Sequence, residues 1–195
     1  MHGLINWSVQ TFVCRTYGHA RWTAILKAAG LGYMSFEPMM SYPDAQSRRM
    51  LDAMCQELKR PLADVLEDLG AFLVADPTNE RLRRLLRFGG QTYVDFLYSL
   101  DDLTDRVQLA VDDLILPGME LREHAPGFFS LTCQPGLPGW GAVLMGMLRT
   151  MADDYGALVV LDHRGLRDGC EVVSIGLVEA AFSDGRAFEL GSAAG

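Results

Sequence analysis

Apolar side chains recur every three to four residues over the first 110 positions of the chain, which is the spacing of helices that bury one face. Glycine and proline interrupt this pattern at Gly18, Gly30 and Pro61, where helices are expected to end or begin. A loop is expected over 32–43. The pattern predicts six helical segments, at residues 4–17, 22–29, 50–58, 61–70, 82–88 and 91–110.

Beyond Pro117 the spacing changes from that of helices to that of strands, and the turn Asp168-Gly169 separates the last two long runs. This part of the chain predicts a helix over 140–151 and strands over 127–133, 157–161, 171–182 and 187–190. Helices followed by an antiparallel sheet define an α+β fold. The chain has 195 residues, so we expect one domain over 1–195. Its helical part covers about 1–110 and its sheet-containing part about 111–195.

Composition and charge exclude several classes of partner. The net charge is −8, and a chain of this sign repels phosphate backbones, which argues against nucleic acid. The longest apolar stretch, 140–148, is far shorter than the roughly 20 residues that cross a bilayer, so no membrane role is expected. The four cysteines form no CxxC pair, which indicates free thiols in a reducing compartment and a cytoplasmic location.

The sequence carries no catalytic motif that would indicate an enzyme. It contains no GxSxG, P-loop, HExxH or GxGxxG pattern, and its four histidines are not spaced as metal ligands on one helix. The glycine-rich stretch 136–141 contains Pro138 and bulky neighbours, so we interpret it as a strand-to-helix connection rather than a phosphate cradle. We therefore expect neither catalysis nor a metal site built from these residues.

One polar residue lies on an apolar helix face. Thr104 follows Leu100 by four residues and Phe96 by eight, so the three share one stripe of the segment 91–110. On the residues alone, Thr104 is a core threonine whose hydroxyl bonds to a carbonyl one turn back.

The segments taken in order resemble the H-NOX family, the heme-nitric oxide/oxygen binding sensors. The landmarks that carry the resemblance span nearly the whole chain: Met1-His2-Gly3-Leu4-Ile5-Asn6, Tyr17-Gly18, Tyr42-Pro43-Asp44, Leu66-Glu67-Asp68-Leu69-Gly70, Asp95-Phe96-Leu97, Leu100-Asp101-Asp102-Leu103 and the strand Phe128-Phe129-Ser130-Leu131-Thr132. The resemblance implies the H-NOX fold, with heme b in a pocket between the helices and the sheet.

The resemblance also identifies the residues at the family's heme-binding positions, and several depart from its pattern. Thr104 stands where the family has the proximal histidine, and Pro117 stands where a proline packs on the porphyrin. A hydroxyl is a poor iron ligand beside imidazole. The propionate-clamp positions, Tyr-x-Ser-x-Arg in the family, are Phe128, Ser130 and Thr132, so the tyrosine and arginine are replaced. The expected lining of the pocket is apolar: Ile5, Leu100, Val143 and Met147.

Two functions follow from the resemblance. The first is a non-catalytic bacterial sensor module with weak or no heme binding, which regulates a separate histidine kinase or cyclic-di-nucleotide enzyme and holds no ligand or an apolar small molecule. The second is a gas sensor with non-standard iron ligation, for which Cys133 and Met147 are the candidate ligands. In the first case we expect large side chains to fill part of the porphyrin's place: Phe96, Phe128, Phe129, Trp140, Met145 and Met147.

Overall fold

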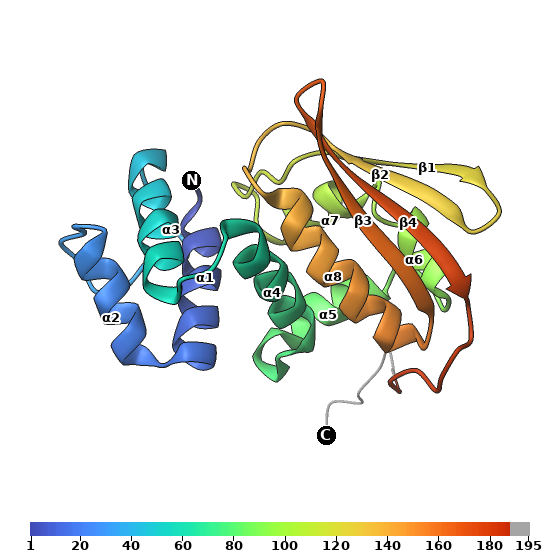
Figure 1. Cartoon of the computed structure of the whole chain (residues 1–195), viewed down its shortest axis with the longest axis horizontal. Coiled ribbons are helices and arrows are strands. Elements are labelled where there is room, and N and C mark those ends of the chain that lie inside the picture. The colour runs from blue at the N-terminus through green and yellow to red at the C-terminus, as the bar shows by residue number, and fades with distance from the viewer. Residues whose placement is uncertain (188–195) are drawn as a thin grey trace.

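The computed structural model describes residues 1–187, in which helices occupy one end of the molecule and an antiparallel sheet the other (Figure 1). The elements are α1 Gly3–Tyr17, α2 His19–Ala28, α3 Asp44–Leu58, α4 Leu62–Ala75, the 3₁₀ turn η1 Pro77–Asn79, α5 Glu80–Arg87, α6 Tyr93–Tyr98, α7 Leu103–Ala110, β1 Met119–Ala125, β2 Phe128–Cys133, α8 Trp140–Tyr155, β3 Leu158–Arg167 and β4 Cys170–Glu179. Helices α1–α3 lie together at one end, and α4 and α8 stand between them and the sheet. The described part contains no helix that is both long and apolar enough to cross a membrane.

The sheet has the strand order β1-β2-β4-β3, with every neighbouring pair antiparallel. Its inner face is apolar: Phe129 and Leu131 of β2 lie opposite Ile175 and Val173 of β4, and all four are buried. Helices α6 and α8 pack on this inner face, since the ring of Phe129 contacts Tyr98 and α8 packs against β3 and β4. The structure thus confirms the α+β class and the covering helix.

The element boundaries differ from the predicted ones in several places, including the start of α3, which lies at Asp44 rather than at residue 50. The segment 91–110 is two helices, because a capping box at Thr92 begins α6 and a turn at Ser99–Asp102 separates it from α7. Helix α4 continues five residues past Gly70, and β3 is longer than predicted. Strand β1 was not predicted, because its exposed positions are charged and obscure the alternation. Of the predicted strand 187–190, only Ala187 lies within the described residues, and it is not in a strand.

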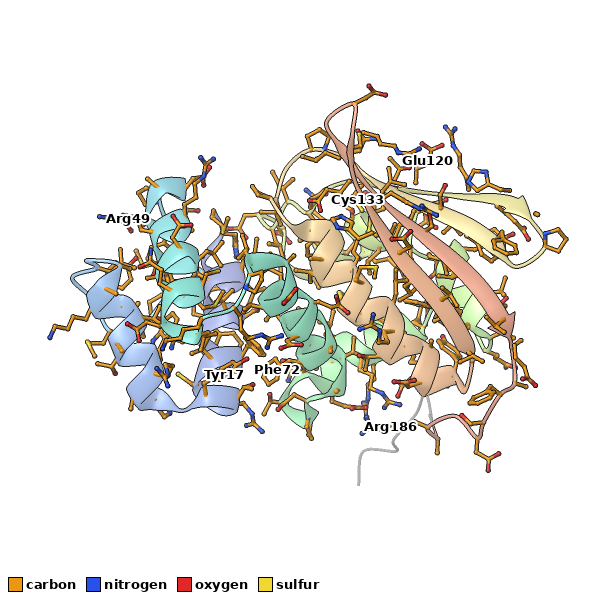
Figure 2. All side chains as sticks on the ribbon, viewed as in Figure 1. Tyr17, Arg49, Phe72, Glu120, Cys133 and Arg186 are labelled. Atoms are coloured by element: carbon orange, nitrogen blue, oxygen red, sulfur yellow. The ribbon has the colours of Figure 1, made fainter. Side chains whose placement is uncertain are left out.

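Aromatic contacts attach the helical end of the molecule to α4. The Phe12 ring of α1 meets Tyr17 at 5.8 Å and Phe72 of α4 at 5.5 Å, both in edge-on geometry. Figure 2 shows Tyr17 and Phe72 at this junction. Edge-to-face pairs of this kind add to the stabilisation that burial alone provides. The Phe12–Phe72 pair therefore helps to hold α1 on α4.

Helices α4 and α8 touch backbone to backbone through two glycines. A Cβ atom on Gly70 would overlap the carbonyl oxygen of Val143, and one on Gly146 would overlap the carbonyl oxygen of Glu67. Glycine normally weakens a helix interior, and here the close approach explains its presence. Gly70 therefore permits the helix contact. The sequence had suggested that Gly70 ends the helix, but α4 continues to Ala75.

Replacing Gly70 by alanine is expected to lower the free energy of unfolding by about 1–3 kcal/mol, the usual cost of overpacking a close-packed core. Urea unfolding followed by circular dichroism measures the change. Gly32→Ala is the matched control, because a Cβ atom there meets nothing within 4 Å. Equal stability of the two variants would contradict the prediction.

Candidate functional site

Thr104 and Pro117 are in direct contact. Thr104 lies half-buried on α7, and its hydroxyl donates a hydrogen bond to the carbonyl oxygen of Pro117 at 3.1 Å. Pro117 is buried just before β1. The acceptor residue follows Thr104 by 13 positions in the sequence. It is therefore not the carbonyl one turn back that the sequence suggested. The bond therefore ties α7 to the start of the sheet.

Thr104→Val removes this hydrogen bond with little change in volume and leaves the Pro117 carbonyl without its donor. We expect a loss of about 1 kcal/mol in the free energy of unfolding, measured by urea denaturation. Thr104→Ser keeps the hydroxyl and separates the bond from the lost methyl contact. If the serine variant loses as much free energy of unfolding as the valine variant, the hydrogen bond does not account for the loss.

The residues expected to line the pocket belong to the hydrophobic core. Leu100 is buried at the turn between α6 and α7, and Val143 and Met147 are buried on α8. The backbones of Val143 and Met147 lie directly against Gly70 of α4. Ile5 is half-buried on α1 and packs against the same core. Helices from both ends of the molecule thus supply this apolar set.

The three positions assigned to the propionate clamp lie elsewhere. Successive side chains of β2 alternate between faces, and Phe128, Ser130 and Thr132 are on the outer face, away from α6 and α8. Phe128 is 64% exposed. The Ser130 hydroxyl lies 2.7 Å from Nε2 of His124, an exposed residue of β1. The structure therefore does not bring these three residues to Thr104.

The same alternation decides which large side chains occupy the interior. Phe96, Phe129, Met145 and Met147 are buried, and Trp140 is half-buried. Phe128 faces solvent, which corrects the expectation that it fills internal space. Its neighbour Phe129 lies in the interior instead, because the odd-numbered residues of β2 point inward.

The residues present do not fit a heme held in the way that the resemblance implies. The Thr104 hydroxyl is a weak iron ligand and is already bonded to Pro117. Phe128, Ser130 and Thr132 supply no cation for a propionate. Among the described residues, no group of three or more histidine, cysteine or acidic side chains is placed to hold a metal ion.

Cys133 is also poorly suited to bind iron. It lies at the end of β2 nearest the start of α8 (Figure 2) and is 1% exposed. Burial, followed by the charges of Glu171 and Cys170, raises the pKa of Cys133 to about 12. Since the thiolate is the form that binds metals, a thiol with this pKa stays protonated near neutral pH.

The raised pKa predicts that Cys133 is unreactive in the folded protein. A thiol-disulfide reagent at pH 8 should give the same native titration for the wild type and for Cys133→Ser, because the thiolate is the nucleophile. In denaturant, the wild type should titrate one thiol more than the variant. Loss of a fast-reacting thiol in native Cys133→Ser would refute the assignment.

Sequence reasoning missed a carboxylate that holds the beginning of α8. Glu171 of β4 accepts hydrogen bonds from the backbone N–H groups of Gly139 and Gly141, each at 3.0 Å, and lies 3.1 Å from Nε2 of His163. A negative charge there also complements the helix dipole. The signal in the sequence was the glycine-rich start of a helix that lacks its own capping side chain.

Comparison with known proteins identifies the class to which this architecture belongs. The fold matches an H-NOX protein from S. oneidensis in the Fe(II)NO ligation state with a TM-score of 0.72 and 16% identity, covering 91% of this chain and 99% of that one. A mutant H-NOX protein from T. tengcongensis matches with a TM-score of 0.72 and 16% identity, covering 93% of this chain and 100% of that one.

The family model for Haem-NO-binding matches residues 2–163, so the chain belongs to this family, also called H-NOX. Soluble guanylate cyclase 89Db of Drosophila melanogaster is 21% identical over 155 residues, which are 80% of this chain and 23% of the cyclase. Soluble guanylate cyclase gcy-31 of Caenorhabditis elegans is 20% identical over 154 residues, which are 79% of this chain and 22% of that protein. The chain thus spans about a quarter of the length of these curated relatives.

Proposed function

We propose that this domain is a non-catalytic sensor module that binds heme weakly or not at all and regulates a separate partner protein. The observation that carries the proposal is the hydrogen bond from Thr104 to the Pro117 carbonyl, at the position where the resemblance places the iron ligand. The bond engages the Thr104 hydroxyl and joins α7 to the segment just before β1. Membership of the Haem-NO-binding family supports the sensor part of the proposal.

The partner we propose is a cytoplasmic signalling protein, a histidine kinase or a cyclic-di-nucleotide enzyme, in a bacterial cell. The chain matches only about a quarter of two guanylate cyclases, which supports a module that accompanies a larger signalling protein. We take residues 1–195 as one domain for this purpose. The ligand we propose is an apolar small molecule, because the residues at the expected pocket positions, Leu100, Val143 and Met147, are apolar and buried.

The alternative is a functional NO or O₂ sensor with non-standard iron ligation. The similarity of the fold to the S. oneidensis H-NOX protein in its Fe(II)NO state favours it. Met147 is then the remaining candidate among the two proposed ligands, since the Cys133 thiol stays protonated. Met147 is buried on α8 and its backbone N–H lies against Gly70 of α4, so its sulfur would have to bind iron from within the hydrophobic core.

Heme binding by the purified protein distinguishes the two functions. We expect the wild type to bind substoichiometric heme, because it offers iron neither imidazole nor an arginine clamp. Thr104→His should raise heme uptake, because position 104 lies on α7 beside Pro117. The Soret band and a pyridine hemochrome assay measure both, after incubation with equal amounts of hemin.

Thr104→Val is the control, since it removes the hydroxyl without adding an iron ligand. Stoichiometric heme in the wild type would overturn the proposal and favour the gas sensor. Uptake by Thr104→His no greater than by Thr104→Val would show that position 104 does not face a heme site.

A further inference from the structure

The chain turns back after β4, and its segment 182–186, which we call the strap, lies on the C-terminal end of α8 (Figure 1). The backbone N–H of Phe182 donates to the carbonyl of Gly156, just after α8, at 2.8 Å. The backbone N–H of Arg186 donates to the carbonyl of Asp154 at 2.9 Å. Figure 2 shows Arg186 near the end of α8. Backbone hydrogen bonds thus attach the strap to α8 at both ends of the strap.

Two glycines bring the strap against the end of α8 with no side chain between them. A Cβ atom on Gly185 would lie 2.7 Å from the carbonyl oxygen of Asp154, and one on Gly156 would lie 2.0 Å from the carbonyl oxygen of Ser183. Neither distance leaves room for a side chain. The attached position of the strap therefore requires glycine on both sides of the contact.

Asp154 is also the residue by which α5 holds the end of α8. Nε of Arg83 donates to the Asp154 carboxylate at 2.6 Å, and both side chains are buried. Nη1 of Arg87 donates to the Asp154 carbonyl at 3.3 Å, and its guanidinium lies 3.9 Å from the centre of the Tyr155 ring. One carbonyl oxygen thus accepts hydrogen bonds from both α5 and the strap, so a displacement of α5 would disturb the attachment of the strap.

Arg106 of α7 joins α7 to α5. Its Nη1 donates to the carbonyl of Leu85 in α5 at 3.2 Å, and its Nη2 donates to the carbonyl of Ser99 at 2.6 Å. The Ser99 side chain lies against the segment that follows α5, since a Cβ atom on Gly89 would overlap its hydroxyl. A continuous series of contacts therefore runs from α7 through α5 to Asp154 and the strap.

We propose that the strap is the output element of the domain, and that its attachment to α8 is coupled through α5 to the position of α7. The inference rests on the proposed function, in which a ligand in the core acts on α7. While Arg106 holds α5 in place, the arginines of α5 keep Asp154 where the strap binds it. A shift of α7 moves α5, and the strap detaches from Asp154. The attached and detached states are then the two states that a partner protein distinguishes.

The strap is suited to this role because little besides its backbone holds it. All five of its residues are exposed. Segments with few buried contacts open locally, at free energies well below that of global unfolding. The amide hydrogens of the strap therefore exchange by local opening, and their exchange rates measure its attachment rather than the stability of the whole domain.

Hydrogen exchange of single backbone amides, followed by NMR on the full chain without added heme, tests the coupling. Arg106→Met removes both hydrogen bonds of the guanidinium and should speed the exchange of the Arg186 amide about fivefold or more. Arg106→Lys keeps the charge but not the planar donor group, so it should give a smaller acceleration in the same direction. Arg49→Met is the matched control, because it removes an exposed arginine on α3 at the far end of the molecule (Figure 2).

Coupling between two elements is reciprocal, so a change in the strap should also be detected on α7. Gly185→Ala places a Cβ atom against the Asp154 carbonyl and detaches the strap. It should speed the exchange of the Arg106 amide, which donates to the carbonyl of Asp102 at 3.0 Å. Gly32→Ala is its control, because a Cβ atom there meets nothing within 4 Å.

Circular dichroism verifies that each variant is folded, and Arg106→Lys carries the test if Arg106→Met does not fold. Exchange of the Arg186 amide at the rate found in Arg49→Met overturns the proposal. So does a Gly185→Ala variant whose Arg106 amide exchanges as in Gly32→Ala. The result is independent of the heme assay, since stoichiometric heme would overturn the proposed function and leave the measured coupling in place.

Discussion

The backbone contact between α4 and α8 is the constraint on which the rest of the structure depends. Gly70 and Gly146 let two helix backbones meet where any side chain would separate them. With its flank fixed on α4, α8 is also held at both ends. Glu171 of β4 binds its first N–H groups, and the buried Arg83–Asp154 pair joins its last turn to α5. A buried pair of this kind is costly to break, because one charge would remain without its partner. The helical end and the sheet are thus both located relative to one helix.

The hydrogen bond of Thr104 follows from the need of a partly buried hydroxyl for a partner. A polar group removed from water must find a partner, or its desolvation remains uncompensated. Thr104 finds that partner in the Pro117 carbonyl, and α7 is thereby held to the chain segment that enters β1. In the function we propose, this internal bond takes the place of a bond between α7 and a cofactor. The position of α7 then depends on the packing around it, including any apolar molecule that alters the core near Leu100.

The sequence predicted the helices that have a regular apolar face, and it failed where a structure depends on partners distant in the chain. Local spacing sets the faces of α1 and α8, so the helices predicted over 4–17 and 140–151 are present. Strand β1 exists because β2 pairs with it, and its own charged residues do not reveal this. The positions Phe128, Ser130 and Thr132 can be listed from a motif. Which face of the sheet they occupy follows only from the register of β2 with β4. Glu171 was missed for the same reason, since it acts on a helix 30 residues away in sequence.

Helix α7 is held by side-chain contacts to two other parts of the chain. Thr104 donates to the carbonyl of Pro117, and Arg106 donates to the carbonyls of Leu85 on α5 and Ser99. A ligand that binds better to one position of α7 than to another would shift the helix toward that position. By linkage, a partner protein that prefers the same position would strengthen the binding of that ligand by the same free energy. Under the proposed function, no catalytic group is needed to connect the ligand and the partner.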